Sequence, residues 1–157
     1  MNRLAAPFTL LPLLLLATIL WLGVGSCPVS AEQNGSLTIQ LAQIEPERGG
    51  SLRIALFRGE QGWPKLKNAF RQQQIAANQK QLEVRFSNLP YADNYAIEVH
   101  HDENGNGKFD MRWLPYPRPK EGVGVSNNIF GFGHPDFTDA RFPISQPQQT
   151  LLIEMHY

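Results

Sequence analysis

The chain has almost no cysteine, because Cys27 is the only one in 157 residues. A disulfide framework is therefore excluded as its source of stability. Neither sign of charge is in excess, with 14 Lys and Arg against 14 Asp and Glu. A nucleic-acid binder needs a basic surface to replace phosphate counterions, so we expect no nucleic-acid partner. The sequence also lacks a Ser or Cys nucleophile in a recognisable turn and a Gly-rich phosphate loop. We therefore expect no enzyme activity.

Charge is scarcest at the start of the chain. The first 31 residues carry one charged side chain, Arg3, ahead of an apolar run from Leu10 to Val24. Val29-Ser30-Ala31 then supplies the small-x-small pattern that signal peptidase cuts. These three features together predict a secretory signal peptide over residues 1–31 and a single exported domain over residues 32–157.

Two other interpretations of the N-terminal segment stay open. Val24-Gly25-Ser26-Cys27 resembles a bacterial lipobox, in which acylated Cys27 would hold the protein on a membrane. An uncleaved segment from Leu4 to Val24 would be nearly long enough to span a bilayer. Each interpretation places residues 32–157 in the periplasm, outside the cell or on the envelope. A membrane is expected as a partner only through one of these two anchors.

Apolar residues alternate with polar ones over most of the exported part, which is the period of half-buried β-strands. Short runs of this kind, separated by turn residues, predict an antiparallel sandwich of about seven strands. The immunoglobulin-like or transthyretin-like architecture fits best. The expected strands contain residues 37–41, 52–56, 82–86, 95–99, 140–144 and 151–155, with a weaker one at 122–126.

Two local features refine this all-β prediction. Leu89-Pro90 followed by Tyr95 resembles a sandwich corner in which a Tyr hydroxyl ties back the crossover, although the turn here is one residue longer and lacks Gly. Residues 64–74 carry Leu66, Ala69 and Phe70 at helical spacing after Pro64. That spacing predicts one short helix over Trp63.

The one segment with chemistry is an acidic loop from Asp102 to Asp110. Oxygen side chains stand at its positions 1, 3, 5 and 9, and Gly107 stands at position 6, as in a calcium loop. Lys108 at position 7 would add its backbone carbonyl, and Phe109 would face the core. The predicted calcium ligands are therefore Asp102, Asn104, Asn106, Lys108 and Asp110.

The loop departs from the calcium pattern at position 12, where Trp113 replaces the usual bidentate acid. Water would complete the coordination, or an acid from elsewhere, for which Glu121, Asp136 and Asp139 are the candidates. The low ligand charge predicts an affinity of about 10⁻⁴ to 10⁻³ M. The alternative is a bare turn, because Asn-Gly and Asp clusters form turns without any metal.

Three histidines allow a less favoured zinc interpretation. His100 and His101 are adjacent, so on a strand their rings point to opposite faces, and His134 would be the third ligand. We expect instead a structural role for His101 and surface exposure for His100.

Two long motifs stand in a characteristic order, residues 95–110 and residues 121–142, and shorter segments at 55–57 and 62–64 accompany them. With these motifs the sequence resembles the bacterial family known as domain of unknown function 2141. The resemblance implies a small, exported, all-β protein and supplies neither activity nor substrate.

Residues 122–137 form a long connection with two open interpretations. Ser126, Asn127 and Asn128 beside Phe130, Phe132 and Phe137 would suit a sugar or peptide ligand. Alternatively, the connection folds over the acidic loop with its rings in the core, and Asn127 or Asn128 bonds that loop.

The sequence leaves three candidate functions. The first is an exported non-enzymatic module with a calcium loop and an unknown envelope or extracellular ligand. The second is a module that binds carbohydrate or envelope polymer, and the third is a metal-dependent hydrolase using His101 and Asp102.

Overall fold

Strands dominate residues 33–131 and 133–157, the part of the chain that the computed structural model describes. The first five strands are β1 (Asn34–Ala42), β2 (Ser51–Arg58), β3 (Arg71–Ala76), β4 (Leu82–Pro90) and β5 (Ala92–Asp102). The remaining five are β6 (Met111–Arg112), β7 (Arg118–Pro119), β8 (Val123–Val125), β9 (Phe142–Ile144) and β10 (Gln148–Glu154). The helical elements are the 3-10 turns η1 (Pro46–Arg48), η2 (Leu66–Asn68) and η3 (Ser126–Asn128) and the helix α1 (Phe137–Ala140).

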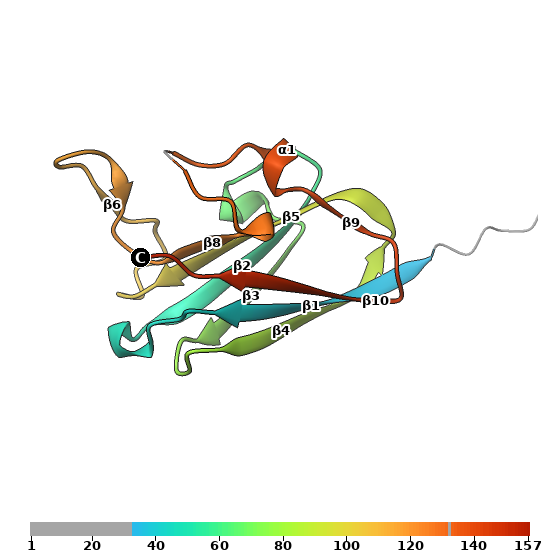
Figure 1. Ribbon diagram of the computed structural model, residues 1–157, viewed down its shortest axis with the longest axis horizontal. Coiled ribbons are helices and arrows are strands. Elements are labelled where there is room, and N and C mark those ends of the chain that lie inside the picture. Colours follow the sequence, from blue (N-terminus) through green and yellow to red (C-terminus); the bar gives the residue numbers. More distant parts are fainter. Residues whose placement is uncertain (1–32, 132) are drawn as a thin grey trace, which may run out of the picture. The chain divides into compact units, whose positions relative to one another are not determined.

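Two sheets carry the fold (Figure 1). The first has the order β10-β1-β4, and the second has the order β3-β2-β5-β8 with β9 added to β5. Pairing is antiparallel throughout except between β1 and β10, which run parallel with Ile39 opposite Leu151. β6 and β7 form a separate two-stranded hairpin. In the described residues, no helix is both long and apolar enough to cross a membrane.

The main core lies between the two sheets. Alternate residues of each strand point inward, as the period of two requires. From the first sheet come Leu37, Ile39, Leu41, Val84, Phe86 and Ile153, and from the second Leu52, Ile54, Leu56, Ile97 and Val99. All are at most 3% exposed. The predicted all-β sandwich is therefore confirmed, and its inward positions are those that the alternation indicates.

The tyrosine corner is also confirmed. Tyr95 is fully buried, and its hydroxyl donates a 2.8 Å hydrogen bond to the carbonyl of Pro90. The bond spans five residues, so it fixes the crossover between β4 and β5 despite the longer turn.

The predicted helix over residues 64–74 is wrong. Only η2 is helical there, and β3 begins at Arg71 and pairs with β2, with Ile75 opposite Leu52. Leu66 and Ala69 still pack with Trp63 on a second apolar cluster. One helical turn is enough to place both side chains there. The free edge of β2 then recruits the following residues as a strand, whose exposure alternates with period two.

Strand boundaries near the C-terminus also differ from the prediction. Ala140 was expected to begin a strand but ends α1, so the strand is only β9. The sequence pattern missed the short β6 and β7 because two-residue strands have no periodicity. The predicted signal peptide, the lipobox at Cys27 and the anchor from Leu4 to Val24 all lie outside the described residues.

Candidate functional site

The acidic loop begins at the end of β5, the central strand of the larger sheet. Tyr95, Ile97 and Val99 face the main core, so Glu98, His100 and Asp102 face the opposite side of the sheet. All three are nevertheless buried, at 4%, 1% and 2% exposure. Asp102 is thus held by the sheet itself, while residues 104–109 of the loop are exposed.

Asx-type hydrogen bonds curl the loop around its own side chains. The Gly107 N–H donates to Asp102 Oδ2 at 2.9 Å, the Asn106 N–H to Asn104 Oδ1 at 2.9 Å, and the Lys108 N–H to Asn106 Oδ1 at 2.6 Å. Gly107 has a φ of +71°, a left-handed conformation in which a Cβ is strained. The glycine at position 6 is therefore required by the bend.

The predicted ligands are brought together in this loop. Asp110 Oδ2 accepts from the side-chain amides of Asn104 at 2.7 Å and of Asn106 at 3.0 Å. Asp102 joins the same turn through Gly107, and Lys108 joins it through Asn106. A guanidinium nitrogen of Arg53 on β2 donates to the carbonyl of Gly107 at 2.6 Å. The sequence spacing therefore selected a real structural unit.

Glu121 braces this unit across its two ends. Its carboxylate is 2% exposed and accepts the N–H of Glu103 at 3.2 Å and of Asp110 at 3.4 Å. Its Oε2 also lies 2.8 Å from Nε2 of His100. Of the three acids proposed to complete the site, Glu121 is therefore at the loop. Asp136 and Asp139 lie instead at α1, where the carbonyl of Asp136 accepts the N–H of Asp139.

The loop passes one test for a hard cation. Asp102 Oδ1 is buried and has no hydrogen-bond partner among the described residues, although its Oδ2 is used. A buried carboxylate oxygen without a donor is costly unless something positive reaches it. Carboxylate, amide and backbone oxygens are the ligands that Ca²⁺ prefers. The donor set therefore fits calcium.

No group of three or more His, Cys, Asp or Glu side chains in the described part of the chain is arranged around one metal position. A transition-metal centre needs such a group. A calcium loop does not, because amide and backbone carbonyl oxygens supply much of its coordination.

The three histidines of the zinc interpretation are separated by the fold. His100 meets Glu121, and His134 meets Glu98. His101 lies 2.9 Å from the hydroxyl of Tyr157 and 2.6 Å from the carbonyl of Gly49, so both of its ring nitrogens are engaged. This arrangement supports a structural role for His101. The expected exposure of His100 is wrong, because the strand continues past it and Glu121 and Phe109 cover it.

Two other expectations about the loop were wrong. Phe109 does not face the core but is 39% exposed, with its ring 5.2 Å from that of His100. Asn127 and Asn128 do not bond the acidic loop. Asn127 donates to the carbonyls of Asp139 and Arg141, and Asn128 exchanges hydrogen bonds with β10. Both side-chain amides therefore tie the connection to the end of α1 and to β10, and these segments lie closer to it than the acidic loop does.

The connection from 122 to 137 therefore keeps few groups for a sugar. Ser126 is fully buried and bridges the N–H of Ile97 and the carbonyl of Ala140. Phe137 packs in the second apolar cluster, and Phe130 is 40% exposed. Phe132 lies outside the described residues.

Sequence reasoning missed one buried acid. Glu98 Oε1 lies 3.2 Å from Nε2 of His134, and Glu98 Oε2 is buried without a partner in the described residues. The His134 ring packs edge-on against Trp63 at 5.1 Å. Burial alone lowers the pKa of His134, but the charge and hydrogen bond of Glu98 and the carbonyl of Pro135 raise it overall. The polar residues at alternate positions 98, 100 and 102 were the available signal.

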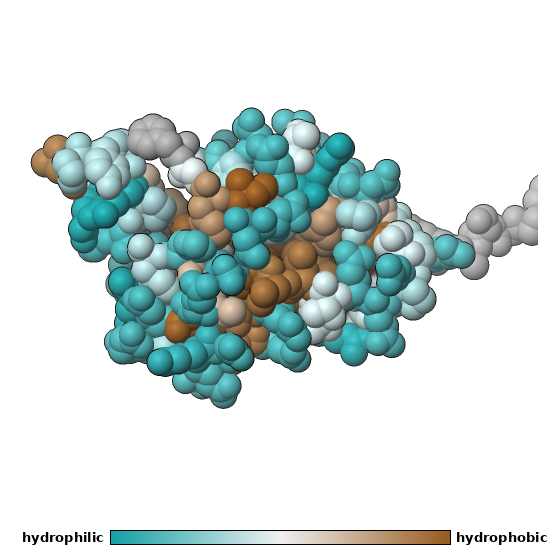
Figure 2. Space-filling model, in the orientation of Figure 1, coloured by the Kyte–Doolittle hydropathy of each residue, from teal (hydrophilic) through white to brown (hydrophobic). Residues whose placement is uncertain are grey.

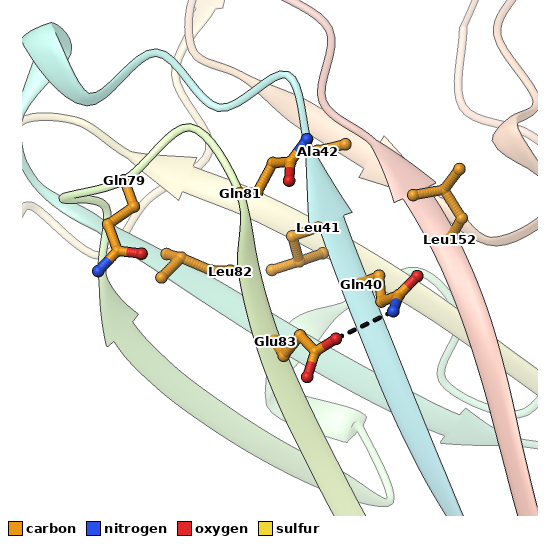
Figure 3. Close-up of a pocket in the computed structure, with 8 residues that line it drawn as sticks. All are labelled: Gln40, Leu41, Ala42, Gln79, Gln81, Leu82, Glu83 and Leu152. Atoms are coloured by element: carbon orange, nitrogen blue, oxygen red, sulfur yellow. Dashed lines mark hydrogen bonds between the residues drawn. The ribbon is translucent and has the colours of Figure 1, made fainter.

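A groove of about 460 Å³ lies elsewhere, on the outer side of the smaller sheet. Figure 3 shows its lining, in which Gln40 on β1 donates to Glu83 on β4 at 2.9 Å and Leu152 lies on the other neighbouring strand, β10. The lining residues are Gln40, Leu41, Ala42, Gln79, Gln81, Leu82, Glu83 and Leu152. Glu83 is their one ionisable group. No acid–base or nucleophilic pair meets there, so the loop remains the candidate site.

The comparisons with known proteins identify a family for this chain. A family model described as an uncharacterized protein conserved in bacteria (DUF2141) matches residues 33–151. The match includes the acidic loop, Glu121 and the connection to α1. Neither the curated proteins nor the solved structures gave a match.

Proposed function

Since this chain belongs to DUF2141, an uncharacterised bacterial family, we propose its function from the geometry of its site. The protein is an exported, non-enzymatic β-sandwich module whose acidic loop binds one calcium ion. The ion stiffens the loop on the sheet, and the module displays its surface to a ligand of the envelope or the exterior.

The observation that carries the calcium proposal is the free oxygen of Asp102. The carboxylate is 2% exposed, one oxygen accepts from Gly107, and the other has no partner in the described residues. A cation there would bind Asp102, Asp110, the amide oxygens of Asn104 and Asn106 and the carbonyl of Lys108. The expected dissociation constant is about 10⁻⁴ to 10⁻³ M, which suits the calcium concentrations outside cells.

Export is supported by the N-terminal sequence. Arg3, the apolar run and the small-x-small site before Glu32 have the order of a signal peptide. An exported domain without disulfides gains rigidity from a bound ion without needing a larger hydrophobic core. The protein would then lie in the periplasm, outside the cell or attached to the envelope.

A non-enzymatic role is supported by how the candidate catalytic groups are used. A hydrolase would need His101 and Asp102 to reach a substrate. His101 is fully buried with both ring nitrogens engaged, and Asp102 is 2% exposed at the strand end. His101 serves the fold, and Asp102 belongs to the proposed calcium site.

Titration calorimetry and thermal unfolding test the proposal on the protein purified from the bacterial envelope fraction. At ten times the dissociation constant, calcium should stabilise the folded state by about 1.4 kcal/mol. For a domain of this size the melting temperature should rise by about 4 °C. Asp102→Asn should abolish both the heat and the rise. Asp139→Asn removes the same charge from α1 and should change neither.

Two results would contradict the proposal separately. Absence of heat and of any shift at millimolar calcium would remove the ion and leave Glu121 as the brace of a bare turn. Mass spectrometry of the purified chain tests export, because an N-terminus at Glu32 shows cleavage and an acylated Cys27 shows a lipoprotein. An intact Met1 in a cytosolic fraction would contradict export.

A further inference from the structure

The chain leaves the acidic loop as a projecting hairpin made of β6, β7 and the residues between them. Met111 pairs with Pro119 and Arg112 with Arg118, and the Lys120 N–H donates to the carbonyl of Asp110 at 3.0 Å. Figure 1 shows β6 on an arm that stands away from the two sheets. Figure 2 shows hydrophobic atoms at the outer end of the same arm.

The tip of this hairpin is the most exposed apolar segment of the described residues. Trp113 is 69% exposed, Leu114 is 81% exposed and Tyr116 is 53% exposed, whereas no other large hydrophobic residue described exceeds 46%. Such a group of exposed large side chains indicates a surface that something covers. Pro115 and Pro117 restrict the backbone between the strands, so the tip is presented with little conformational entropy left to lose.

The base of the hairpin carries uncompensated positive charge. Arg112 and Arg118 stand directly opposite each other, and like charges in that position repel. Among the described residues, no ion pair includes Arg112, Arg118 or Lys120. The Arg118 guanidinium lies 5.8 Å from the centre of the Tyr116 ring. The arrangement favours an anionic surface outside the protein.

The order of side chains along the hairpin matches the depth profile of an anionic bilayer. Leu114 lies at the tip, Trp113 and Tyr116 have apolar rings with polar handles, and the two arginines follow at the base. Aromatic residues of this type settle at the interface between hydrocarbon and headgroups, and basic residues settle at the headgroups. We infer that residues 111–119 dock this protein on an anionic lipid surface. The inference rests on the hairpin residues and uses neither calcium binding nor acylation of Cys27 as a premise.

A fluorescent probe at the tip tests this contact in the full chain. Cys27→Ser removes the only native cysteine, and Leu114→Cys or Ser145→Cys then accepts an environment-sensitive dye. Ser145 is exposed in the turn between β9 and β10 and serves as the matched position. With vesicles of phosphatidylglycerol and phosphatidylcholine, the dye at 114 should shift to the blue and be quenched by lipids brominated in the acyl chain. The dye at 145 should do neither.

Substitutions of the arginines test the electrostatic part of the lipid contact, and substitutions of the aromatic rings test its apolar part. The double variant Arg112→Ala and Arg118→Ala should bind anionic vesicles about 30-fold more weakly. Trp113→Ala should weaken binding severalfold, whereas Phe70→Ala, which removes another ring that is 42% exposed, should not.

Three outcomes would overturn the inference. A dye at 114 that stays unquenched on every vesicle would show that a protein or nothing covers the tip. Equal quenching at 114 and 145 would show attachment by the N-terminal segment without docking. Equal quenching on pure phosphatidylcholine would remove the anionic character of the surface.

Discussion

The two faces of β5 are equally buried but use different chemistry. Tyr95, Ile97 and Val99 face the core between the sheets and are fully buried. Glu98, His100 and Asp102 face the other side, at 4%, 1% and 2% exposure. The first face is covered by the smaller sheet, and the second by the loops that follow β5.

This difference determines how each face is stabilised. The inner face is stabilised by the burial of apolar surface area. It tolerates substitutions that conserve the volume and shape of the side chains. The outer face depends on particular donors, since each buried polar atom must be matched. One oxygen of Glu98 is met by His134, one oxygen of Asp102 by the N–H of Gly107, and Nε2 of His100 by Glu121. The second oxygen of each acid is buried without a partner among the described residues. Substitutions on the two faces should therefore differ in size and in their dependence on pH.

The largest effect is expected on the inner face. Ile97→Ala should lower the free energy of unfolding by about 2–5 kcal/mol, because it leaves a cavity among packed side chains. Urea unfolding followed by circular dichroism measures the change. Leu152→Ala, at 46% exposure on β10, is the control and should cost about 0.5 kcal/mol. Equal losses in the two variants would contradict a core centred between the sheets.

The next effect is expected at the brace on the outer face. Glu121→Gln should cost about 1–3 kcal/mol, because one carboxylate oxygen that accepts N–H donors becomes a donor itself. Hydrogen exchange should accelerate at the amides of Glu103 and Asp110 while β1 keeps its protection. Glu83→Gln removes the same charge from an exposed position and should change little. Unaltered exchange in the loop would show that Glu121 does not hold it.

A smaller effect is expected where a polar atom enters the inner face. Tyr95→Phe deletes the hydroxyl that bonds Pro90 and should cost about 1 kcal/mol. Tyr91→Phe is the matched control, since the structure gives no hydrogen bond for the Tyr91 hydroxyl within the described residues. Chemical denaturation of the two variants side by side measures the difference. If they are equally stable, the corner bond contributes nothing.

The smallest effect depends on pH. Glu98 raises the folded-state pKa of His134, so protonation of His134 favours the folded state. The contribution is complete below the unfolded pKa of about 6.5 and is lost as pH rises through the folded pKa. His134 is 32% exposed, so the loss should stay below about 1 kcal/mol. The stability gap between wild type and His134→Gln should narrow from pH 5.5 to pH 8. A stability gap that widens over this pH range would contradict the stabilising interaction between Glu98 and protonated His134.

The success of the predictions made from sequence differs between the two faces of β5 in a similar way. The inward residues of β1, β2, β4 and β5 were predicted, because alternation along consecutive residues encodes them. The corner at Tyr95 and the members of the acidic loop were predicted from short motifs, a Leu-Pro pair ahead of a Tyr and oxygen side chains at the spacing of a calcium loop. The helix expected at 64–74 was wrong, because its apolar spacing also fits a single turn followed by the edge strand β3. The burial of His100 could not be predicted, since it depends on Glu121, which lies 21 residues later.

The sequence by itself determined β1, β2, β4, β5 and β10, the side of each of these strands that is apolar and the oxygen-rich turn after β5. These properties depend on neighbouring residues, whose spacing is written in the chain. Only the tertiary structure decided which charged groups are buried and what meets them. Glu121 reaches the N–H of Glu103 from 18 residues away, and His134 reaches Glu98 from 36. Such partners follow from the path of the loops across the sheet, which local periodicity does not encode.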